Sequence, residues 1–215
     1  MSQNYLSIYA KSFNWAGFFL PKSKYNNCST LYDFCRTVDN IADEEENLDI
    51  KKKNFKEFKK RFYEKDFSSI KIRNMWQLIH EFSISTKIID DLFDGIETDL
   101  QEKVLLSNEK DLLIYSYRVA GTVGLMMAKI LKVKSNLALT SAIDLGIAMQ
   151  LTNIARDVIE DSERNRNYID NNFDKIKETI KLADTFYNNS FRSIGEIPIS
   201  CRFAILVARR VYRQI

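Results

Sequence analysis

Residues that end or bend secondary structure are scarce in this sequence. The 215 residues include only two prolines and six glycines, so most of the usual signals for turns are missing. This scarcity favours long helices joined by short connections. No stretch of useful length alternates apolar and polar residues, which is the pattern that predicts a β-strand. We therefore expect an all-α protein that forms one domain over residues 1–215.

Histidine and cysteine are almost as rare. The three cysteines, Cys28, Cys35 and Cys201, are odd in number and lack the spacing of metal ligands, so we interpret them as reduced thiols of a cytoplasmic protein. A di-iron helical bundle would need Glu-x-x-His pairs, and the single histidine, His80, has no such partner. Glycine-rich nucleotide-binding motifs are absent too, and the segment 121–124 is better explained by close helix packing.

Charge of one sign and long apolar runs are also lacking. The net charge is +3 and the sequence pI is about 8.6, which is too weakly basic to indicate nucleic-acid binding. We find no apolar run of the roughly 18 residues that a membrane-spanning helix needs. Residues 1–10 do not follow the pattern of a secretory signal. Many lysines flank apolar Phe55, Phe58 and Phe62 in segment 51–65, and a solvated helix face explains them better than attraction to anionic lipid.

Apolar residues recur at helical spacing along most of the chain. The segments expected to be helical are 4–20, 31–44, 49–65, 69–80, 85–101, 109–131, 135–161, 171–191 and 198–215.

The most informative stretch is Gln150-Leu-Thr-Asn-Ile-Ala-Arg-Asp-Val-Ile-Glu-Asp161. In a helix, Asn153, Asp157 and Asp161 are four residues apart and lie on one face. Repeated like charges destabilise a helix, so a positive group should lie over them. Oxygen ligands without His or Cys suit a hard cation such as Mg²⁺, whose remaining positions are filled by water and substrate phosphate. The stretch therefore predicts a metal-bridged diphosphate site.

A second acidic helix is predicted at 31–44, where Arg36, Asp39 and Asp43 share a face. Spacing alone says little, because Asp-x-x-x-Asp occurs four times in the chain and a solvated helix face explains most such pairs. The pairs 39/43 and 157/161 differ from the others because apolar residues surround them. If both helices face one cavity, its four carboxylates need metal ions or arginines as counter-charge.

These two stretches resemble the two aspartate motifs of the squalene/phytoene synthase family. Leu31-Tyr-Asp-Phe-Cys-Arg-Thr-Val-Asp-Asn-Ile-Ala-Asp-Glu44 is similar to the first, and 150–161 matches the second nearly residue for residue. Segments 11–13, 115–124 and 166–168 also resemble family blocks in the same order, so the resemblance covers essentially the whole chain. It implies an all-α isoprenoid-synthase fold, with a single helical domain and a central cavity. It also implies head-to-head (1′-1) joining of two prenyl diphosphates through a cyclopropyl diphosphate.

The resemblance assigns roles to residues at the matching positions. It implies that Mg²⁺, with Mn²⁺ as a substitute, and the diphosphates are held by Asp39, Asp43, Asn153, Asp157 and Asp161. It implies that substrate diphosphate is contacted, or the site ordered, by Lys11, Ser12, Arg36, Gln150, Arg156, Arg166 and Tyr168. It places around the reaction centre Tyr32, Tyr115 and Tyr212. An allylic cation can be stabilised by aromatic faces, for which the candidates are Phe13, Phe18, Phe19, Tyr32, Phe34, Tyr115 and Tyr117.

The sequence departs from the family pattern in three places. Asn40 stands where many members have a second aspartate, but the Asp-x-x-x-Asp pair is intact, so we expect metal binding to persist. Asn165 stands before Arg166 where glycine is common, and we expect it to alter that loop. The family normally continues with further helices beyond Ile215, so we expect this chain to lack the last helices, which would close the pocket.

The form of the second motif is most like that of bacterial phytoene synthases, which act on geranylgeranyl diphosphate in carotenoid biosynthesis. The alternative is a farnesyl diphosphate user that makes squalene, hydroxysqualene or dehydrosqualene, and NADPH is expected only for a squalene synthase. Relatives that serve as non-catalytic assembly factors of respiratory complexes lose motif aspartates, and both motifs are intact here. Chain-elongating synthases and terpene cyclases would show DDxxD or NSE-type patterns instead.

Because such substrates and products are apolar, we also expect peripheral association with the inner face of the membrane. The basic segment 51–65 is one candidate surface for it, and the other is the last helix with Arg202, Arg209, Arg210 and Arg213.

Overall fold

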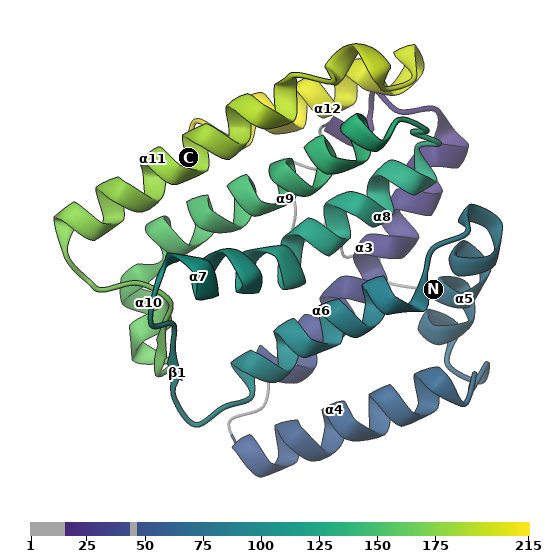
Figure 1. Ribbon diagram of the computed structural model, residues 1–215. Helices are drawn as coiled ribbons and strands as arrows, with labels where there is room; N and C mark the ends of the chain where they lie inside the picture. Colours follow the sequence, from purple (N-terminus) through teal and green to yellow (C-terminus); the bar gives the residue numbers. More distant parts are fainter. Residues whose placement is uncertain (1–15, 44–46) are drawn as a thin grey trace.

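The structure, a computed structural model, describes residues 16–43 and 47–215 as an assembly of helices (Figure 1). In chain order, the elements are α3 (Lys22–Asp43), α4 (Leu48–Tyr63), α5 (Ile70–Phe82), α6 (Thr86–Asp99), β1 (Val104–Leu105), α7 (Glu109–Ser116), the π-helix η1 (Tyr117–Gly121), α8 (Thr122–Ile130), α9 (Asn136–Arg156), α10 (Val158–Glu163), β2 (Arg166–Asn167), α11 (Phe173–Phe191), the 3₁₀-helix η2 (Ile194–Glu196) and α12 (Ile199–Tyr212). The expected all-α architecture is confirmed.

Helix α9 lies in the middle of the assembly (Figure 1). It packs against α11 and α12 on one side and against η1 and α8 on the other. Helix α3 packs on α8, α5 and α4, and α6 packs on η1 and α8. The two helices that carry the aspartate motifs, α3 and α9, therefore both pack against α8.

The predicted helix 109–131 is interrupted by a π-turn. The N–H of Thr122 donates a hydrogen bond to the carbonyl oxygen of Tyr117, five residues back, where an α-helix would bond four residues back. Such turns often occur at functional sites because the extra residue changes which side chains face a cavity. In this chain the turn falls between Tyr115 and α8.

The predicted helix 135–161 is divided at Asp157, whose φ of −99° and ψ of 14° are not helical. The division is slight, because the N–H of Asp157 still donates to the carbonyl oxygen of Asn153 at 2.8 Å. The N–H of Asp161 donates to the carbonyl oxygen of Asp157 at the same distance. The three oxygen-bearing residues therefore follow one another along the α9–α10 junction, as their spacing predicts.

One short pair of strands was not predicted. Val104–Leu105 pairs in parallel with Arg166–Asn167. Two residues are too few to produce a recognisable alternation of apolar and polar residues, so the sequence gives no signal for this pair.

Two glycines allow helices to approach closely, which confirms the packing role predicted for the small residues. A Cβ on Gly124 would lie 2.2 Å from the carbonyl oxygen of Ala142 in α9. A Cβ on Gly146 of α9 would lie 2.3 Å from the carbonyl oxygen of Ala120 in η1. Neither contact is tolerable for a larger residue, so the backbones of η1 and α8 lie directly against α9.

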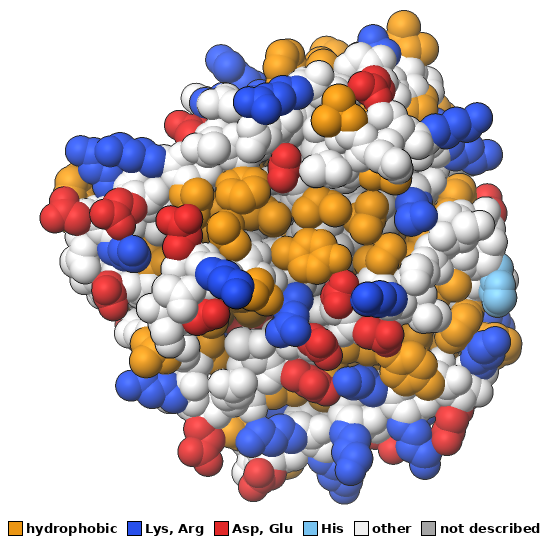
Figure 2. All heavy atoms as spheres, viewed as in Figure 1, with side chains coloured by type: hydrophobic (Ala, Val, Ile, Leu, Met, Phe, Trp, Pro, Cys, Tyr) orange, Lys and Arg blue, Asp and Glu red, His pale blue; other side chains and the backbone are white. Residues whose placement is uncertain are grey.

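The aromatic stripe of segment 51–65 forms part of the core. Phe55 and Phe62 on α4 are 2% and 0% exposed, and both pack on Phe93 of α6. The opposite face of α4 is polar, and lysine and arginine side chains, interspersed with acidic ones, cover the lower edge of the molecule in Figure 2. The prediction of a solvated face over an apolar seam is therefore confirmed.

Helix α9 passes a test of length and apolar composition for membrane-crossing helices. The expectation that no segment would do so is wrong for this helix. Its apolar composition has a local cause, because α9 packs against helices on both sides and also lines a cavity with Ala138, Ala142 and Leu145. A core helix that is packed on several sides can satisfy the same criteria of length and composition.

Candidate active site

An acidic cavity of about 270 Å³ lies between α3, α6, α7 and the α9–α10 junction. The acidic residues in its walls are Asp39, Asp43, Asp99, Asp157, Glu160 and Asp161, and the basic ones are Arg36, Arg164 and Arg166. The two aspartate motifs therefore face one cavity, as their apolar surroundings predict.

Helix α3 directs Arg36, Asp39 and Asp43 into this cavity. Burial and, to a lesser extent, the nearby Asp43 carboxylate raise the pKa of Asp39 to about 7, although Arg36 opposes the effect. Asp43 accepts a hydrogen bond from Nη1 of Arg166 at 2.9 Å, and Nη2 of the same guanidinium donates to the carbonyl oxygen of Ala42 at 3.2 Å. Asp43 is thus fixed by an arginine, whereas Arg36 and Arg166 offset the effect of burial on Asp39 only in part.

The α9–α10 junction supplies the second set of oxygens. Asp157 is held by a two-pronged ion pair with its neighbour Arg156, with N–O distances of 2.6 and 2.5 Å. Burial and, to a lesser extent, the Asp157 carboxylate raise the pKa of Asp161 to about 6, although Arg166 opposes the rise. The side-chain oxygen of Asn153 is buried and accepts no hydrogen bond from any described residue.

Asp99, at the end of α6, is a site residue that the sequence motifs did not identify. Its carboxylate accepts hydrogen bonds from the hydroxyls of Tyr115, at 2.9 Å, and Tyr168, at 2.6 Å. The two tyrosine rings stack at 4.6 Å. Burial raises the pKa of Asp99 to about 6, although Arg166 and the two hydroxyls favour its charged form.

A signal for Asp99 does exist in the sequence. Leu92, Ile96 and Asp99 are spaced i, i+4 and i+7, so a carboxylate falls on the buried stripe of an amphipathic helix. The other acidic residues of that helix do not lie on this stripe, which distinguishes Asp99 from them.

The loop after α10 carries Arg166 and Tyr168 into the cavity. The N–H of Val104 donates to the carbonyl oxygen of Asn165 at 3.0 Å, which begins the β1–β2 pairing and anchors this loop beside α6. Asn165 has a φ of 58°, a left-handed conformation that asparagine adopts more readily than most residues. Asparagine tolerates the conformation that glycine would adopt, and the expectation that Asn165 alters this loop stays a prediction.

An apolar compartment of about 270 Å³ continues from the acidic one. It runs between α3, α8, α9 and α12, and the two compartments share Arg36, Asp39, Val119, Gln150 and Asn153 as lining residues. Tyr32 and Tyr212 lie in the wall of the apolar part. The predicted central cavity therefore has one charged end and one apolar end.

The structure brings most of the predicted site residues to this cavity. Of the described ones, Arg156 is not in its wall and contributes through Asp157. Lys11, Ser12 and Phe13 lie outside the described residues.

Several aromatic candidates for the cavity wall are not there. Phe34 is completely buried in the core against Phe62, where neighbouring helices α3 and α4 meet. Phe18 and Phe19 are 78% and 45% exposed, so the dense aromatic run is neither core nor cavity wall at these positions. Tyr117 faces α6 and donates a hydrogen bond to Asp91 at 2.9 Å. Aromatic character alone does not distinguish these environments.

The residues present fit a hard divalent cation held together with diphosphate. Among the described residues, no group of three His, Cys, Asp or Glu side chains is close enough to hold a metal ion by itself. Mg²⁺ usually takes only one or two carboxylates and completes its shell with water and phosphate oxygens. Three features suit oxygen ligands of a cation: the raised pKa values of Asp39 and Asp161, and the buried oxygen of Asn153, which accepts no hydrogen bond from the described residues.

Fold and site together define an all-helical protein whose cavity suits an amphiphile with an anionic head group. Comparison with known proteins agrees. The family model "Squalene/phytoene synthase" matches residues 6–173, which is well over half of the chain. The chain belongs to the squalene/phytoene synthase family.

Individual relatives support this assignment. The chain is 34% identical over 143 residues to a 15-cis-phytoene synthase of Paracoccus sp., a match that covers 58% of this chain and 47% of the relative. It is 28% identical over 237 residues to a phytoene synthase of Cereibacter sphaeroides, covering 95% and 66%. A dehydrosqualene synthase crystallised with a ligand has the same fold, with a TM-score of 0.83 and 26% identity over 98% of this chain and 81% of that one. This chain thus spans about half to two thirds of the length of these two curated relatives.

Proposed function

We propose that this protein joins two prenyl diphosphates head to head (1′-1) through a cyclopropyl diphosphate, with two geranylgeranyl diphosphates giving phytoene. The observation that carries the proposal is the continuous cavity, whose acidic and apolar compartments share Arg36, Asp39 and Asn153. A prenyl diphosphate has the same division, with a highly charged head joined directly to an apolar chain.

The length of the apolar compartment favours the longer substrate. On α3, its lining residues run from Asp39 back to Tyr25, which is about 21 Å at 1.5 Å per helical residue. An isoprene unit contributes four backbone bonds of about 1.5 Å and spans roughly 5 Å when extended. The four units of a geranylgeranyl chain, about 20 Å, match this length, whereas the three units of a farnesyl chain would leave about 6 Å unfilled.

Mg²⁺, or Mn²⁺ in its place, would be held by Asp39 and Asp43 on one side and by Asn153, Asp157 and Asp161 on the other. When bound, the metal neutralises the charge that develops on the departing diphosphate. The ionised aspartates provide the charge that retains it, and Arg166 sets the position of Asp43 through their 2.9 Å contact.

The chain's own residues favour ionisation of the allylic carbon–oxygen bond. Arg36 and Arg166 face the acidic compartment and can pair with diphosphate oxygens, stabilising the leaving group. The apolar walls exclude water from the allylic cation. The Tyr32 ring lies beside that space, and burial raises the pKa of its hydroxyl to about 12, so it remains a neutral ring able to stabilise a cation.

Farnesyl diphosphate is the second candidate substrate. The fold similarity to a dehydrosqualene synthase supports it, since that relative covers nearly the whole described chain. NADPH would be expected only if the product were squalene. The intact aspartates of both motifs, all facing one cavity, argue against a role as a non-catalytic assembly factor.

The test is incubation with radiolabelled geranylgeranyl or farnesyl diphosphate, in Mg²⁺, in Mn²⁺ and in EDTA, using this chain and a version extended by any downstream sequence. A metal-dependent C40 hydrocarbon from the first substrate is the expected result. A C30 product from the second substrate alone would move the assignment to the squalene branch. Absence of turnover and of diphosphate binding in both versions would reject the enzyme.

Because the proposed substrates and product are lipids, we also propose that this protein is cytoplasmic and associates peripherally with the inner face of the membrane. The exposed lysines of α4, including Lys52, Lys53 and Lys56, are the better candidates for this contact. On α12, Arg209 donates to the carbonyl oxygen of Tyr187 and is thus engaged within the protein. Flotation with anionic liposomes at low salt tests the idea, and failure of the protein to float would remove it.

A further inference from the structure

Val119 occupies a distinctive position in the cavity. It is in the wall of both compartments, together with Arg36, Asp39, Gln150 and Asn153. Among the described residues that border both compartments, Val119 is the only apolar one. The next lining residues along the chain, Ala120 and Val123, border the apolar compartment alone.

Two glycines hold this position from opposite sides. A Cβ on Gly95 of α6 would lie 2.7 Å from Cγ1 of Val119, so glycine provides the space that the valine side chain occupies. On the other side, a Cβ on Gly146 of α9 would lie 2.3 Å from the carbonyl oxygen of Ala120. The backbone of η1 is therefore held between α6 and α9 with little freedom to shift.

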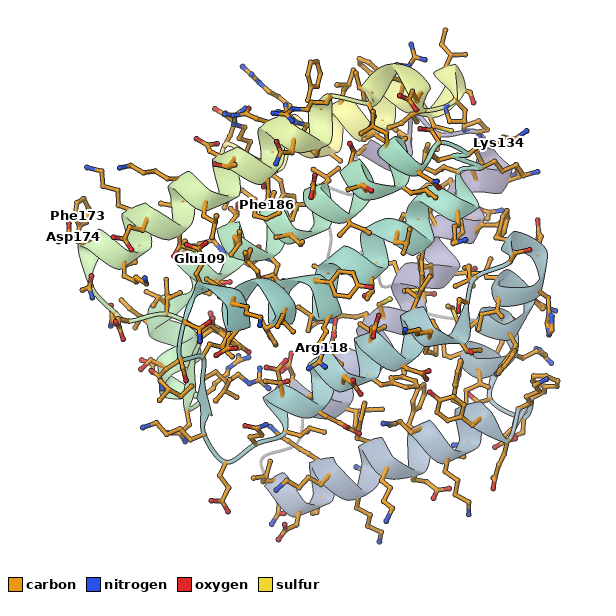
Figure 3. All side chains as sticks on the ribbon, in the orientation of Figure 1. Glu109, Arg118, Lys134, Phe173, Asp174 and Phe186 are labelled. Atoms are coloured by element: carbon orange, nitrogen blue, oxygen red, sulfur yellow. The ribbon has the colours of Figure 1, made fainter. Side chains whose placement is uncertain are left out.

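Polar contacts from η1 to α6 fix the same segment. Tyr117 donates to Asp91 at 2.9 Å, and Arg118 pairs with Asp94 at 3.3 Å. Figure 3 shows Arg118 on the side of η1 that faces α6. Tyr117 and Arg118 are thus bound to α6, and Gly95 and Gly146 allow close packing on both sides of η1. These contacts fix the position of Val119 in the cavity wall.

We propose that Val119 is a specificity-determining residue that forms the neck between the diphosphate compartment and the prenyl-chain compartment. This inference rests on the proposed function and deepens it. The carbon–oxygen bond that breaks joins head to chain, so it must lie near this neck. Valine is small enough to let an extended prenyl chain pass, and its branched side chain has few rotamers. It therefore covers the reacting carbon with a fixed apolar surface.

The neck has a chemical consequence. If water reaches the allylic carbon after the bond to diphosphate breaks, it adds to that carbon and loses a proton, which gives the allylic alcohol and free diphosphate. A smaller side chain at the neck should increase this side reaction at the expense of condensation. A larger one should prevent the chain from entering while leaving the acidic compartment unchanged.

The first test measures binding by titration calorimetry in Mg²⁺. The ligands are inorganic diphosphate and unreactive thiolodiphosphates that carry one, two, three or four isoprene units. In Val119→Phe, every analogue with two units or more should bind at least about tenfold more weakly, while inorganic diphosphate should change by less than about twofold. The matched control is Val123→Phe, about 6 Å deeper along the helix, which should weaken only the longer analogues.

The second test compares Val119→Ala with Val123→Ala and measures the fraction of consumed substrate released as allylic alcohol. This fraction does not depend on how much of the protein is folded. It should rise several-fold in the first variant and clearly less in the second, because Val123 borders the prenyl-chain compartment alone.

Two outcomes separate failure of this inference from failure of the proposed function. If the unmodified protein binds the analogues but the two phenylalanine variants show the same dependence on chain length, Val119 is an ordinary wall residue and the inference is overturned. If the unmodified protein binds neither inorganic diphosphate nor any analogue, the proposed function is rejected, and the inference about Val119 is rejected with it.

Discussion

Replacing Asp39 by asparagine should stabilise the metal-free protein at neutral pH while impairing catalysis. Asp39 has a folded-state pKa of about 7, raised chiefly by burial and by the nearby Asp43 carboxylate. Asparagine has nearly the same shape and no charge, so the substitution removes an unfavourable buried charge. It also removes one of the oxygens proposed to hold Mg²⁺.

The magnitude follows from the shift in pKa. A rise from 3.8 to about 7 corresponds to at most about 4 kcal/mol at 1.36 kcal/mol per unit. The side chain borders a cavity, where solvent screens its charge, so we expect about 2 kcal/mol. The folded state binds this proton more tightly than the unfolded state, so the cost is absent below about pH 4 and grows as the pH rises. It is complete above about pH 7.

The assay is urea unfolding in EDTA at several pH values. The free energy of unfolding of Asp39→Asn should exceed that of the unmodified protein by about 2 kcal/mol near pH 8 and by much less near pH 5. Glu178→Gln is the charge-matched control, because Glu178 is exposed on α11 and pairs with Lys175 at 3.1 Å. A gain that is absent near pH 8, or equal at all pH values, would refute the argument.

Three further outcomes are expected. Tyr168→Phe keeps the ring but removes the hydroxyl that donates to Asp99 at 2.6 Å. A hydrogen bond to a charged group contributes about 1.5–3 kcal/mol, so turnover should fall by roughly 10-fold or more. Unchanged turnover would contradict this. Gly124→Ala places a Cβ 2.2 Å from the Ala142 carbonyl oxygen and should lower the free energy of unfolding by about 1–3 kcal/mol. Gly195→Ala is the control and should not lower it, because the added Cβ meets no described atom within 4 Å. Equal effects of the two variants in urea unfolding would be inconsistent with the close helix packing. Mg²⁺ with inorganic diphosphate should raise the midpoint of thermal unfolding more near pH 8 than near pH 5. The raised pKa values of Asp39 and Asp161 leave fewer aspartates ionised at the lower pH, and metal ligands must be ionised. A larger rise at pH 5 would argue against carboxylate ligands.

The sequence by itself determined the helical architecture and the two aspartate faces. Scarce proline and glycine, with apolar residues at helical spacing, favour helices through interactions that reach only a few residues along the chain. The alignment of Asn153, Asp157 and Asp161 follows from the same short-range geometry, and it survived the division of the helix at Asp157. Such features can be predicted because they depend on near neighbours alone.

Only the tertiary structure decided which residues meet in the site. Arg166 reaches Asp43 across 123 residues of sequence, and Tyr168 reaches Asp99 across 69. No local pattern encodes these pairs, because they arise when helices and a two-residue strand pair pack together. The same holds for Val119, an ordinary apolar residue in sequence that packing against Gly95 places between two compartments. Burial and long-range contacts give these side chains their chemical environment, and both exist only in the folded chain.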